Sequence, residues 1–400
     1  MIEKNSINYL IFIFLFFCNS VWAQKIRHID LLSPVELTGR TGADTFPVFT
    51  LDVLQLRRAY EEGLPERVQF RLLLKEDTLA VGLQRIELLH PAFSLLRADG
   101  TALSLPKGQH YQGLQGDTLL ALSIFPTGLY AQLHTGSGSF SLTANPRQAG
   151  RYYWRAAGSP SDELAHFCQT SDTLDNELRR SIAQLGQMAA LRGSLPPLSV
   201  YFEMDHYLYL EQNEDIETCL WYMLGAFNSV AQIYRLEGIG LQLRGLKVWD
   251  EPDAFSTESA LKALNSFRAY LAETYTEEER DWDAAMLLSR YINEEGIAPL
   301  GGLASLNSLC NLARRQCYGN ISSWYSNYPA YSWTVFVIAH ELGHTLGSPH
   351  SHNCFWPEGP LDDCYCPEGS CAPGPSVAAL GGGTIMSYCY LLDPFSSNCP

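Results

Sequence analysis

Residues 340–350 read His340-Glu341-Leu342-Gly343-His344-Thr345-Leu346-Gly347-Ser348-Pro349-His350, the pattern H-E-x-x-H-x-x-G-x-x-H. On a helix the first two histidines lie about 40° apart, because each residue advances the helix by ~100°. The second glycine can end the helix in a left-handed conformation, and the turn that follows can bring His350 back to the same point. Three neutral imidazoles that converge in this way leave the fourth position of a zinc ion open, as in catalytic zinc sites.

The same stretch supplies a proton acceptor and a reason to form a helix. Glu341 follows the first histidine and is placed to take a proton from a zinc-bound water. Apolar residues recur at helical spacing and form a stripe that can face a core while the histidines face a cleft: Val335, Ile338, Leu342 and Leu346. The sequence therefore predicts His340, His344 and His350 as zinc ligands and Glu341 as the general base.

A second motif lies downstream of the histidines. It reads Gly383-Thr384-Ile385-Met386-Ser387-Tyr388-Cys389, and its methionine follows His350 by 36 residues. The two motifs together resemble those of the metzincin clan of zinc endopeptidases, which has a methionine-containing turn beneath the metal. The run from His344 to Cys354, taken with the second motif, is most similar to bacterial reprolysin (adamalysin)-like proteases. The resemblance covers about residues 196–390.

Two positions differ from the adamalysin pattern. Ser351 follows the third histidine where adamalysins have aspartate, and in this respect the chain is more like the matrixins and serralysins. The turn Met386-Ser387-Tyr388 matches the serralysin form, in which the tyrosine lies near the metal. The resemblance implies that Tyr388 can stabilise the developing oxyanion, and the alternative is that its ring only packs.

The resemblance implies an α+β catalytic domain, in which a twisted, mostly parallel sheet carries an active-site helix. It extends upstream, where Leu198–Glu211 reads as a first strand, Ile216–Leu236 as a long helix and Gly240–Trp249 as a second strand. The segment Gly296–Gly302 resembles the approach to the edge strand above the cleft. We expect a substrate to lie extended near Ile297–Leu303 and to pair its backbone there as an added strand.

The N-terminal residues 1–23 have the features of a secretory signal. Tyr9–Phe17 is an apolar run too short to span a bilayer as a helix, and Val21-Trp22-Ala23 puts small residues before a cleavage point. No later stretch is apolar for long enough to cross a membrane. We therefore expect a secreted protein that begins at Gln24 and has no stable membrane association.

Residues 24–195 have the pattern of a β-rich domain. Alternating apolar residues predict strands at Val68–Leu74 and Leu119–Phe125. The stretch Asp117–Leu142 resembles the later part of a reprolysin propeptide, so a propeptide-like role is expected. The alternative is an independent β-sandwich with a binding role of its own.

A linker is expected from about residue 156. It contains a polar helix at Asp172–Leu191, and cleavage between the two domains would fall in this linker. Residues 196–400 then form the catalytic domain. Related domains usually continue into a final helix. Two alternatives therefore stand for residue 400: it is the natural C-terminus, or it is the end of a fragment.

The chain has 11 cysteines, of which Cys18 would leave with the signal and eight lie after residue 300. In an exported protein, this clustering predicts disulfides around the active site. The spacing Cys364-x-Cys366 with Cys371 leaves a second metal site open as an alternative, although it fits no common zinc template.

Cys168 stands apart from this cluster, in the expected linker. A thiolate is a good zinc ligand, so in a zymogen Cys168 could fill the fourth zinc position and exclude water, as the propeptide cysteine does in some metzincins. The alternatives are a disulfide with Cys219 or another cysteine, and a free buried thiol.

Charge is unevenly distributed along the chain, which has a net charge of −16. Residues 24–195 carry 17 acidic and 17 basic side chains, whereas residues 196–400 carry 25 acidic and 9 basic. Such a field argues against nucleic acid and anionic membranes as partners. Solubility outside the cell explains the excess, with preference for basic peptides or binding of Ca²⁺ by acidic loops as alternatives. We expect a monomer that acts on protein or peptide substrates.

These observations predict a secreted zinc metalloendopeptidase made as a zymogen. Zn²⁺ on the three histidines would polarise the scissile carbonyl and activate water, while Glu341 would accept the proton and pass it to the leaving amine. Met386 would form an apolar floor beneath the ligands without touching substrate. The alternative is a secreted zinc-binding module without catalytic activity, used for binding or adhesion.

Overall fold

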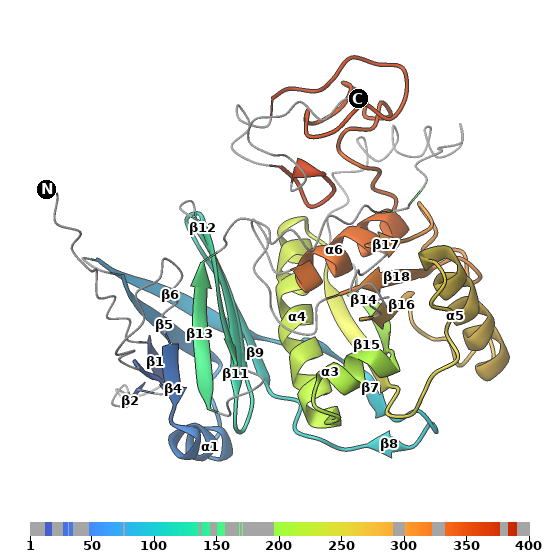
Figure 1. Ribbon diagram of the computed structural model, residues 1–400. Coiled ribbons are helices and arrows are strands. Elements are labelled where there is room, and N and C mark those ends of the chain that lie inside the picture. The colour runs from blue at the N-terminus through green and yellow to red at the C-terminus, as the bar shows by residue number, and fades with distance from the viewer. Residues whose placement is uncertain are drawn as a thin grey trace, which may run out of the picture.

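The computed structural model describes residues 13–17, 27–30, 32–34, 48–74, 77–135, 138–144, 150–156, 168, 170, 196–290, 301–321, 333–376 and 383–389. Within them the chain forms two sheets, and helix α4 (Ile216–Leu236) lies between the two (Figure 1). The predicted mixture of helices and strands is therefore confirmed. The predicted linker helix at Asp172–Leu191 and residues 296–300 of the expected edge segment lie outside the described residues.

The first sheet is antiparallel and comes from the N-terminal half. Its core surrounds Phe70, Val81 and Leu122, and helix α1 (Val53–Glu61) adds Leu56 to it. Its strands in spatial order are β2 (Arg27–Asp30), β1 (Ile13–Phe17), β5 (Arg67–Leu74), β6 (Asp77–Ile86), β9 (Gln109–Gln115), β10 (Thr118–Ile124), β11 (Leu129–Thr135), β12 (Gly138–Ala144), β13 (Arg151–Ala156), β4 (Val48–Leu51) and β3 (Leu32–Pro34).

Strands β5 and β10 confirm the two strands predicted from alternating apolar residues. Strand β1 comes from the apolar run assigned to a secretory signal, and in the full chain it pairs with β2 and β5. Removal of that run as a signal stays a prediction.

The second sheet is mostly parallel and carries the histidine motif at its edge. In spatial order its strands are β17 (Gly302–Leu303), β18 (Gln316–Asn320), β16 (Ala284–Ser289), β14 (Leu198–Met204), β15 (Leu241–Val248), β7 (Leu89–Leu96) and β8 (Ala102–Leu103). Only the pairs β17–β18 and β7–β8 are antiparallel. Strands β7 and β8 come from the N-terminal half, and sequence analysis did not predict that this half contributes strands to the second sheet.

Helices cover both faces of the second sheet. Along β14, Val200, Phe202 and Met204 point to the core shared with α4 and α6 (Trp333–Leu346), whereas Tyr201 points to the core under α5 (Ala260–Thr274). This alternation follows from the two-residue period of a strand, and burial on both faces explains why β14 is apolar throughout.

The prediction of one long strand at Leu198–Glu211 was wrong in its second half. Strand β14 ends at Met204, and helix α3 (His206–Glu211) follows directly. Asp205 caps that helix, because its side chain accepts a hydrogen bond of 2.9 Å from the amide of Leu208. The predicted helix Ile216–Leu236 and the strand at Gly240–Trp249 are confirmed as α4 and β15.

Candidate metal centre

Helix α6 carries the first two histidines of the motif and is anchored along its length. Tyr234 on α4 donates a hydrogen bond of 2.6 Å to the carbonyl of Ala339, and the hydroxyls of Tyr222 and Thr334 lie 2.7 Å apart. The predicted stripe faces the core, where Val335, Ile338 and Leu342 are buried. One face of the helix is thus fixed, and the other turns His340, Glu341 and His344 toward the cleft.

The helix ends where the glycine of the motif was expected to end it. Gly347 has a φ of +105°, and the amide of Ser348 donates to the carbonyl of Gly343 at 2.9 Å. This left-handed turn closes the helix and sends the chain back, so that His350 meets the two helical histidines. All three rings are almost fully buried.

The three rings point one nitrogen each at a common centre. His344 Nε2 lies 3.1 Å from His340 Nε2 and 3.2 Å from His350 Nε2. The other nitrogens have acceptors of their own: His340 Nδ1 donates to the carbonyl of Ile385 at 2.8 Å, and His344 Nδ1 donates to that of Ser348 at 2.8 Å. Since each Nδ1 then carries the proton, each Nε2 presents a lone pair to the centre.

This arrangement fits a zinc ion. Three lone pairs turned toward one another repel unless a cation lies between them. Nitrogens at the usual zinc distance in a tetrahedron are about 3.4 Å apart, close to the spacing of these Nε2 atoms. Burial lowers the pKa of His340 to about 3 and lowers that of His344 well below its usual value, so both rings are neutral and able to act as ligands.

The third histidine has an acidic partner that the sequence did not reveal. His350 Nδ1 donates to Glu368 Oε1 at 3.0 Å, and the same oxygen lies 3.2 Å from His352 Nε2. The other oxygen of Glu368 accepts from Asn353 Nδ2 at 3.0 Å. A carboxylate on the far nitrogen of a metal-binding histidine fixes its tautomer and its orientation.

A disulfide holds Glu368 in this position. Cys354 and Cys371 are bonded and close the loop that contains it. The amide of Cys354 donates to the carbonyl of Glu368 at 3.1 Å, and the amide of Glu368 donates to the carbonyl of His352 at 3.1 Å. The sequence signal for this partner was the cluster of cysteines, which predicted disulfides near the site but not their pairing.

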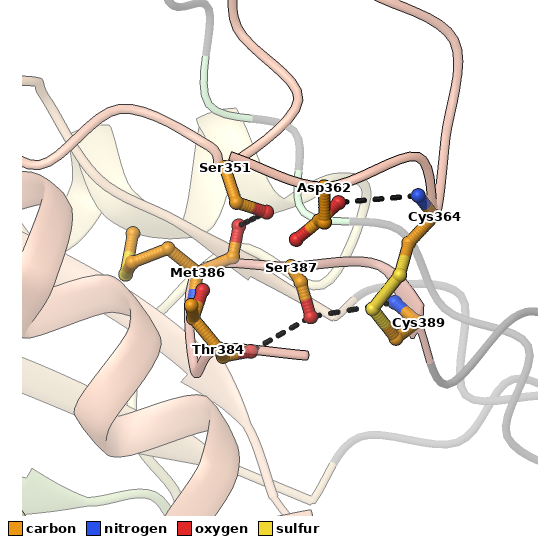
Figure 2. Close-up of a disulfide and its surroundings, with 7 residues drawn as sticks. All are labelled: Ser351, Asp362, Cys364, Thr384, Met386, Ser387 and Cys389. Atoms are coloured by element: carbon orange, nitrogen blue, oxygen red, sulfur yellow. Dashed lines mark hydrogen bonds between the residues drawn. A yellow bond between two sulfur atoms is a disulfide. The ribbon is translucent and has the colours of Figure 1, made fainter. Parts of the chain in front are cut away.

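The methionine turn lies directly under the helix. A Cβ on Gly343 would come within 2.6 Å of Met386 Sδ, so the glycine lets the thioether approach the helix backbone. Both the amide and the hydroxyl of Ser351 donate to the carbonyl of Met386, at 3.0 and 3.4 Å (Figure 2). The residue that replaces the aspartate of adamalysins therefore joins the third histidine to this turn.

A second disulfide joins the turn to the same loop. Cys364 and Cys389 are bonded, and the hydroxyl of Ser387 donates to the carbonyl of Thr384 at 2.7 Å beside them (Figure 2). Cys366 is also disulfide-bonded. The alternative of a second metal site on Cys364, Cys366 and Cys371 is therefore wrong, because their sulfurs are used in disulfides.

Tyr388 reaches the centre from the same turn. Its hydroxyl lies 3.0 Å from His350 Nε2 and donates to the carbonyl of Cys168 at 3.1 Å. The side chain of Tyr388 is buried, and its hydroxyl lies beside the histidines, so the ring does more than pack against its neighbours.

Cys168 lies at the open side of the three histidines. Its Sγ is 3.5 Å from His344 Nε2, and Cys168 forms no disulfide, as is also true of Cys219. The four ligand atoms of Cys168 and the three histidines all lie within 4.8 Å of one another. Sulfur and nitrogen on one tetrahedral zinc are about 3.6 Å apart, so the thiol stands where a fourth ligand would. The alternative of a disulfide between Cys168 and Cys219 is thus wrong.

Thr170, two residues after Cys168, contacts the edge of the second sheet. Thr170 Oγ1 accepts from the amide of Ala304 at 3.0 Å and donates to its carbonyl at 3.3 Å, just beyond β17. Burial raises the pKa of the Cys168 thiol to about 12, and zinc deprotonates a thiol that it binds.

Glu341 lies between the helix and the edge strand. A Cβ on Gly302 would come within 2.1 Å of Glu341 Oε1, so the carboxylate lies directly against the backbone of β17. Cys168, Gly302, Phe336 and Glu341 line one small pocket. The structure therefore brings together every site residue predicted from the sequence.

The family of the second half can now be stated. Residues 198–396 match the model described as Metallo-peptidase family M12. This part of the chain belongs to that family. The description of the family makes residues 198–396 a metallopeptidase domain, in agreement with the resemblance to the metzincin clan drawn from its motifs.

Curated relatives align with the M12 domain. Disintegrin and metalloproteinase domain-containing protein 33 of Homo sapiens is 28% identical over 191 residues, which are 48% of this chain and 20% of that protein. Zinc metalloproteinase recombinant fibrinogenase II of Deinagkistrodon acutus is 27% identical over 178 residues, which are 44% of this chain and 69% of that protein. The chain thus spans only a part of each relative's length.

Among solved structures, metalloproteinase-II from Bacteroides fragilis aligns with 75% of this chain and 86% of its own, at a TM-score of 0.44 and 11% identity. This TM-score and this identity are too low to support any conclusion about the M12 domain. Within the described residues, none of the helices has the length and apolar character needed to cross a bilayer.

Proposed function

We propose that the chain is a secreted zinc-dependent endopeptidase that is kept latent by Cys168 until its linker is cut. The convergence of three histidine Nε2 atoms, with the Cys168 sulfur 3.5 Å from one of them, carries this proposal. The disulfides Cys354–Cys371 and Cys364–Cys389 favour an oxidising, extracellular location.

His340, His344 and His350 would hold the zinc, and Cys168 would be the fourth ligand of the latent form. When bound, zinc supplies a Lewis acid that polarises the scissile carbonyl and lowers the pKa of water. The burial of the three rings excludes bulk water, and Ile385, Ser348 and Glu368 hold their Nδ1 protons in place.

Substrate would take the path that the Cys168 segment now occupies. The side-chain hydroxyl of Thr170 now occupies the amide and the carbonyl of Ala304, and both backbone groups become available to an extended peptide once the segment leaves. Glu341 faces this path from the helix. It would take a proton from the attacking water and deliver it to the leaving amine.

Tyr388 would assist the same step. Its hydroxyl now donates to the carbonyl of Cys168, and that donor becomes available to a substrate oxyanion when the segment departs. Met386 would have no contact with substrate and would support the helix at Gly343. Binding of Ca²⁺ stays a prediction. The groups of metal-binding side chains among the described residues lie at the histidines and at the neighbouring disulfides.

The test is hydrolysis of an unfolded protein such as casein by the chain after its linker is cut. We expect activity that a chelator removes and added zinc restores. Glu341→Gln should lower kcat by about 10²–10⁴-fold while one zinc per chain remains bound. Glu358→Gln, which alters an exposed carboxylate in the same domain, should have no effect.

Two outcomes would contradict the proposal. Full activity in Glu341→Gln would remove the assigned general base. Stoichiometric zinc without hydrolysis in any cut form would favour the alternative, a zinc-binding module used for binding or adhesion.

Latency has its own test. Cys168→Ser in the uncut chain should raise the peptidase rate at least tenfold, because serine is a weaker zinc ligand than thiolate. Cys310→Ser is the matched control, since Cys310 is a free and exposed cysteine. Equal, low rates for the uncut Cys168→Ser and Cys310→Ser variants would contradict the role given to Cys168.

A further inference from the structure

Residues of the N-terminal half contribute to the hydrophobic core of the M12 domain. Leu88, Leu95 and Phe125 of the N-terminal half are buried in the same cluster as Phe202 and Phe227 of the M12 domain. Phe125 stacks on Trp221 of α4, with ring centroids 5.0 Å apart. A core that crosses from one half to the other has no natural plane of separation.

Helix α4 lies between the two sheets, with one face on each (Figure 1). Fourteen of its 21 residues are buried, including polar ones such as Asn228 and Gln232. A helix that belonged to the surface of an independent domain would keep a polar, solvated face. The sequence of α4 is therefore suited to cover on both sides.

The buried polar residues of α4 are used by the N-terminal sheet. Asn228 Nδ2 donates to the carbonyl of Leu122 and to the hydroxyl of Ser123, both at 3.1 Å. Gln112 Nε2 donates in return to the carbonyl of Asn228 at 3.0 Å, and Gln232 Nε2 donates to the carbonyl of Leu120 at 3.0 Å. Loss of the N-terminal sheet would leave these groups without partners on an otherwise apolar helix.

Strand β7 adds a second attachment. It pairs in parallel with β15, with Leu95 opposite Leu246 and Leu96 opposite Lys247. Just past both strands, Asp250 accepts from Arg97 Nε at 2.7 Å and from the amide of Ala98 at 3.0 Å. Without β7, strand β15 would be an unpaired edge with buried apolar side chains, which proteins normally avoid.

The segment around Cys168 has a different set of contacts. Thr170 contacts Ala304 at the edge strand, and Cys168 contacts Tyr388 and His344 at the centre. These contacts all lie on the cleft, where they would compete with substrate, and they differ from those made by β7 and by the strands that cover α4.

We propose that residues 24–158 stay bound to the M12 domain after the linker is cut, as a lasting subunit of the mature protein. Departure of the short segment that carries Cys168 then suffices to open the site. The association rests on the proposed function only in assuming that the linker is cut at all. It is non-covalent, because residues 24–158 contain no cysteine.

The experiment places one recognition sequence for a site-specific protease after Gly158 and a second after Gly193 of the full chain. After digestion, size-exclusion chromatography in native buffer at micromolar concentration should yield the N-terminal piece and the M12 domain in one peak. Separate elution of the two pieces, or precipitation of the M12 domain away from a soluble N-terminal piece, would overturn the proposal.

A variant at the interface tests whether the contacts with α4 hold the two pieces together. Gln112→Ala removes the side chain that donates to Asn228, and we expect the dissociation constant of the digested complex to rise at least tenfold. Gln84→Ala is the matched control, because Gln84 lies in the same sheet and bonds Arg67 at an exposed site. Equal constants for the two variants would count against the interface described.

Peptidase activity of the same fractions is measured separately. Co-elution without hydrolysis would leave the subunit inference standing and would contradict the proposed function. Hydrolysis by an M12 domain that elutes alone would support the proposed function and would contradict the subunit inference.

Discussion

Each of the three histidine rings holds its Nδ1 against a separate acceptor, and those acceptors come from three different segments. Ser348 belongs to the turn after the helix, Ile385 to the methionine turn and Glu368 to the disulfide-closed loop. The site is therefore preorganised by its surroundings, and a change in one acceptor should act on the metal through one ring.

Glu368 is the acceptor that substitution can test most cleanly. Glu368→Ala should weaken zinc binding about 10–100-fold, because His350 loses the group that fixes its tautomer. Glu368→Gln should restore most of the affinity, since an amide oxygen can still accept from Nδ1. Competition with a chelator measures the affinity, and Glu358→Ala in the same loop serves as control. Unchanged affinity in Glu368→Ala would contradict this positioning role.

Gly302 tests the placement of the general base. Gly302→Ala puts a methyl group where the carboxylate of Glu341 now lies, so the carboxylate must move. We expect kcat to fall at least tenfold with little change in zinc content. If kcat is unchanged, Glu341 does not act from the position seen in the structure.

The residues of the site differ in how far the sequence could predict them. His340, His344 and His350 stand at fixed intervals on one helix and its turn, so local geometry alone brings them together. Gly302 and Glu368 lie 38 residues before and 18 residues after that stretch. Their positions depend on sheet pairing and on a disulfide, and neither can be deduced from spacing.

At the scale of elements, the loop from Cys354 to Cys371 joins the third histidine to the methionine turn. One disulfide closes the loop, and the other ties its middle to Cys389 (Figure 2). The loop has little regular structure of its own, so we expect it to depend on these bonds for its shape.

Removal of the first disulfide should therefore act on stability and on the metal together. Cys354→Ser/Cys371→Ser should lower the free energy of unfolding by about 2–4 kcal/mol, as measured by denaturant titration. It should also weaken zinc binding, because Glu368 is no longer held on His350. Cys310→Ser again serves as control. Loss of stability with unchanged zinc affinity would show that the loop does not position Glu368.

Elements with local signals were predicted well. Asp215 caps α4 through the amides of Glu217 and Thr218, and the apolar run after it gave the observed bounds of the helix. Strand β14 was drawn too long, because the cap at Asp205 was read as part of an apolar strand. The place of β7 beside β15 was missed, since the pairing joins segments about 150 residues apart and has no short-range signature.

In the whole molecule, the two halves that we predicted from the sequence as separate domains are packed against each other. One half closes the second sheet and covers α4, and the other holds the histidines. We expect the uncut chain to unfold in one cooperative transition, monitored in parallel by near-ultraviolet circular dichroism and by release of zinc. Two well-separated transitions would indicate that the shared core contributes little to stability.

The central claim is that three imidazoles, joined by the Cys168 thiolate in the latent form, bind a single zinc ion. X-ray absorption at the zinc edge of the uncut, zinc-loaded chain tests it most directly. The account predicts one zinc per chain with three nitrogen ligands and one sulfur ligand, and the sulfur should disappear in Cys168→Ser while the nitrogens remain. A chain that binds no stoichiometric zinc, or a ligand shell that Cys168→Ser leaves unaltered, would contradict it.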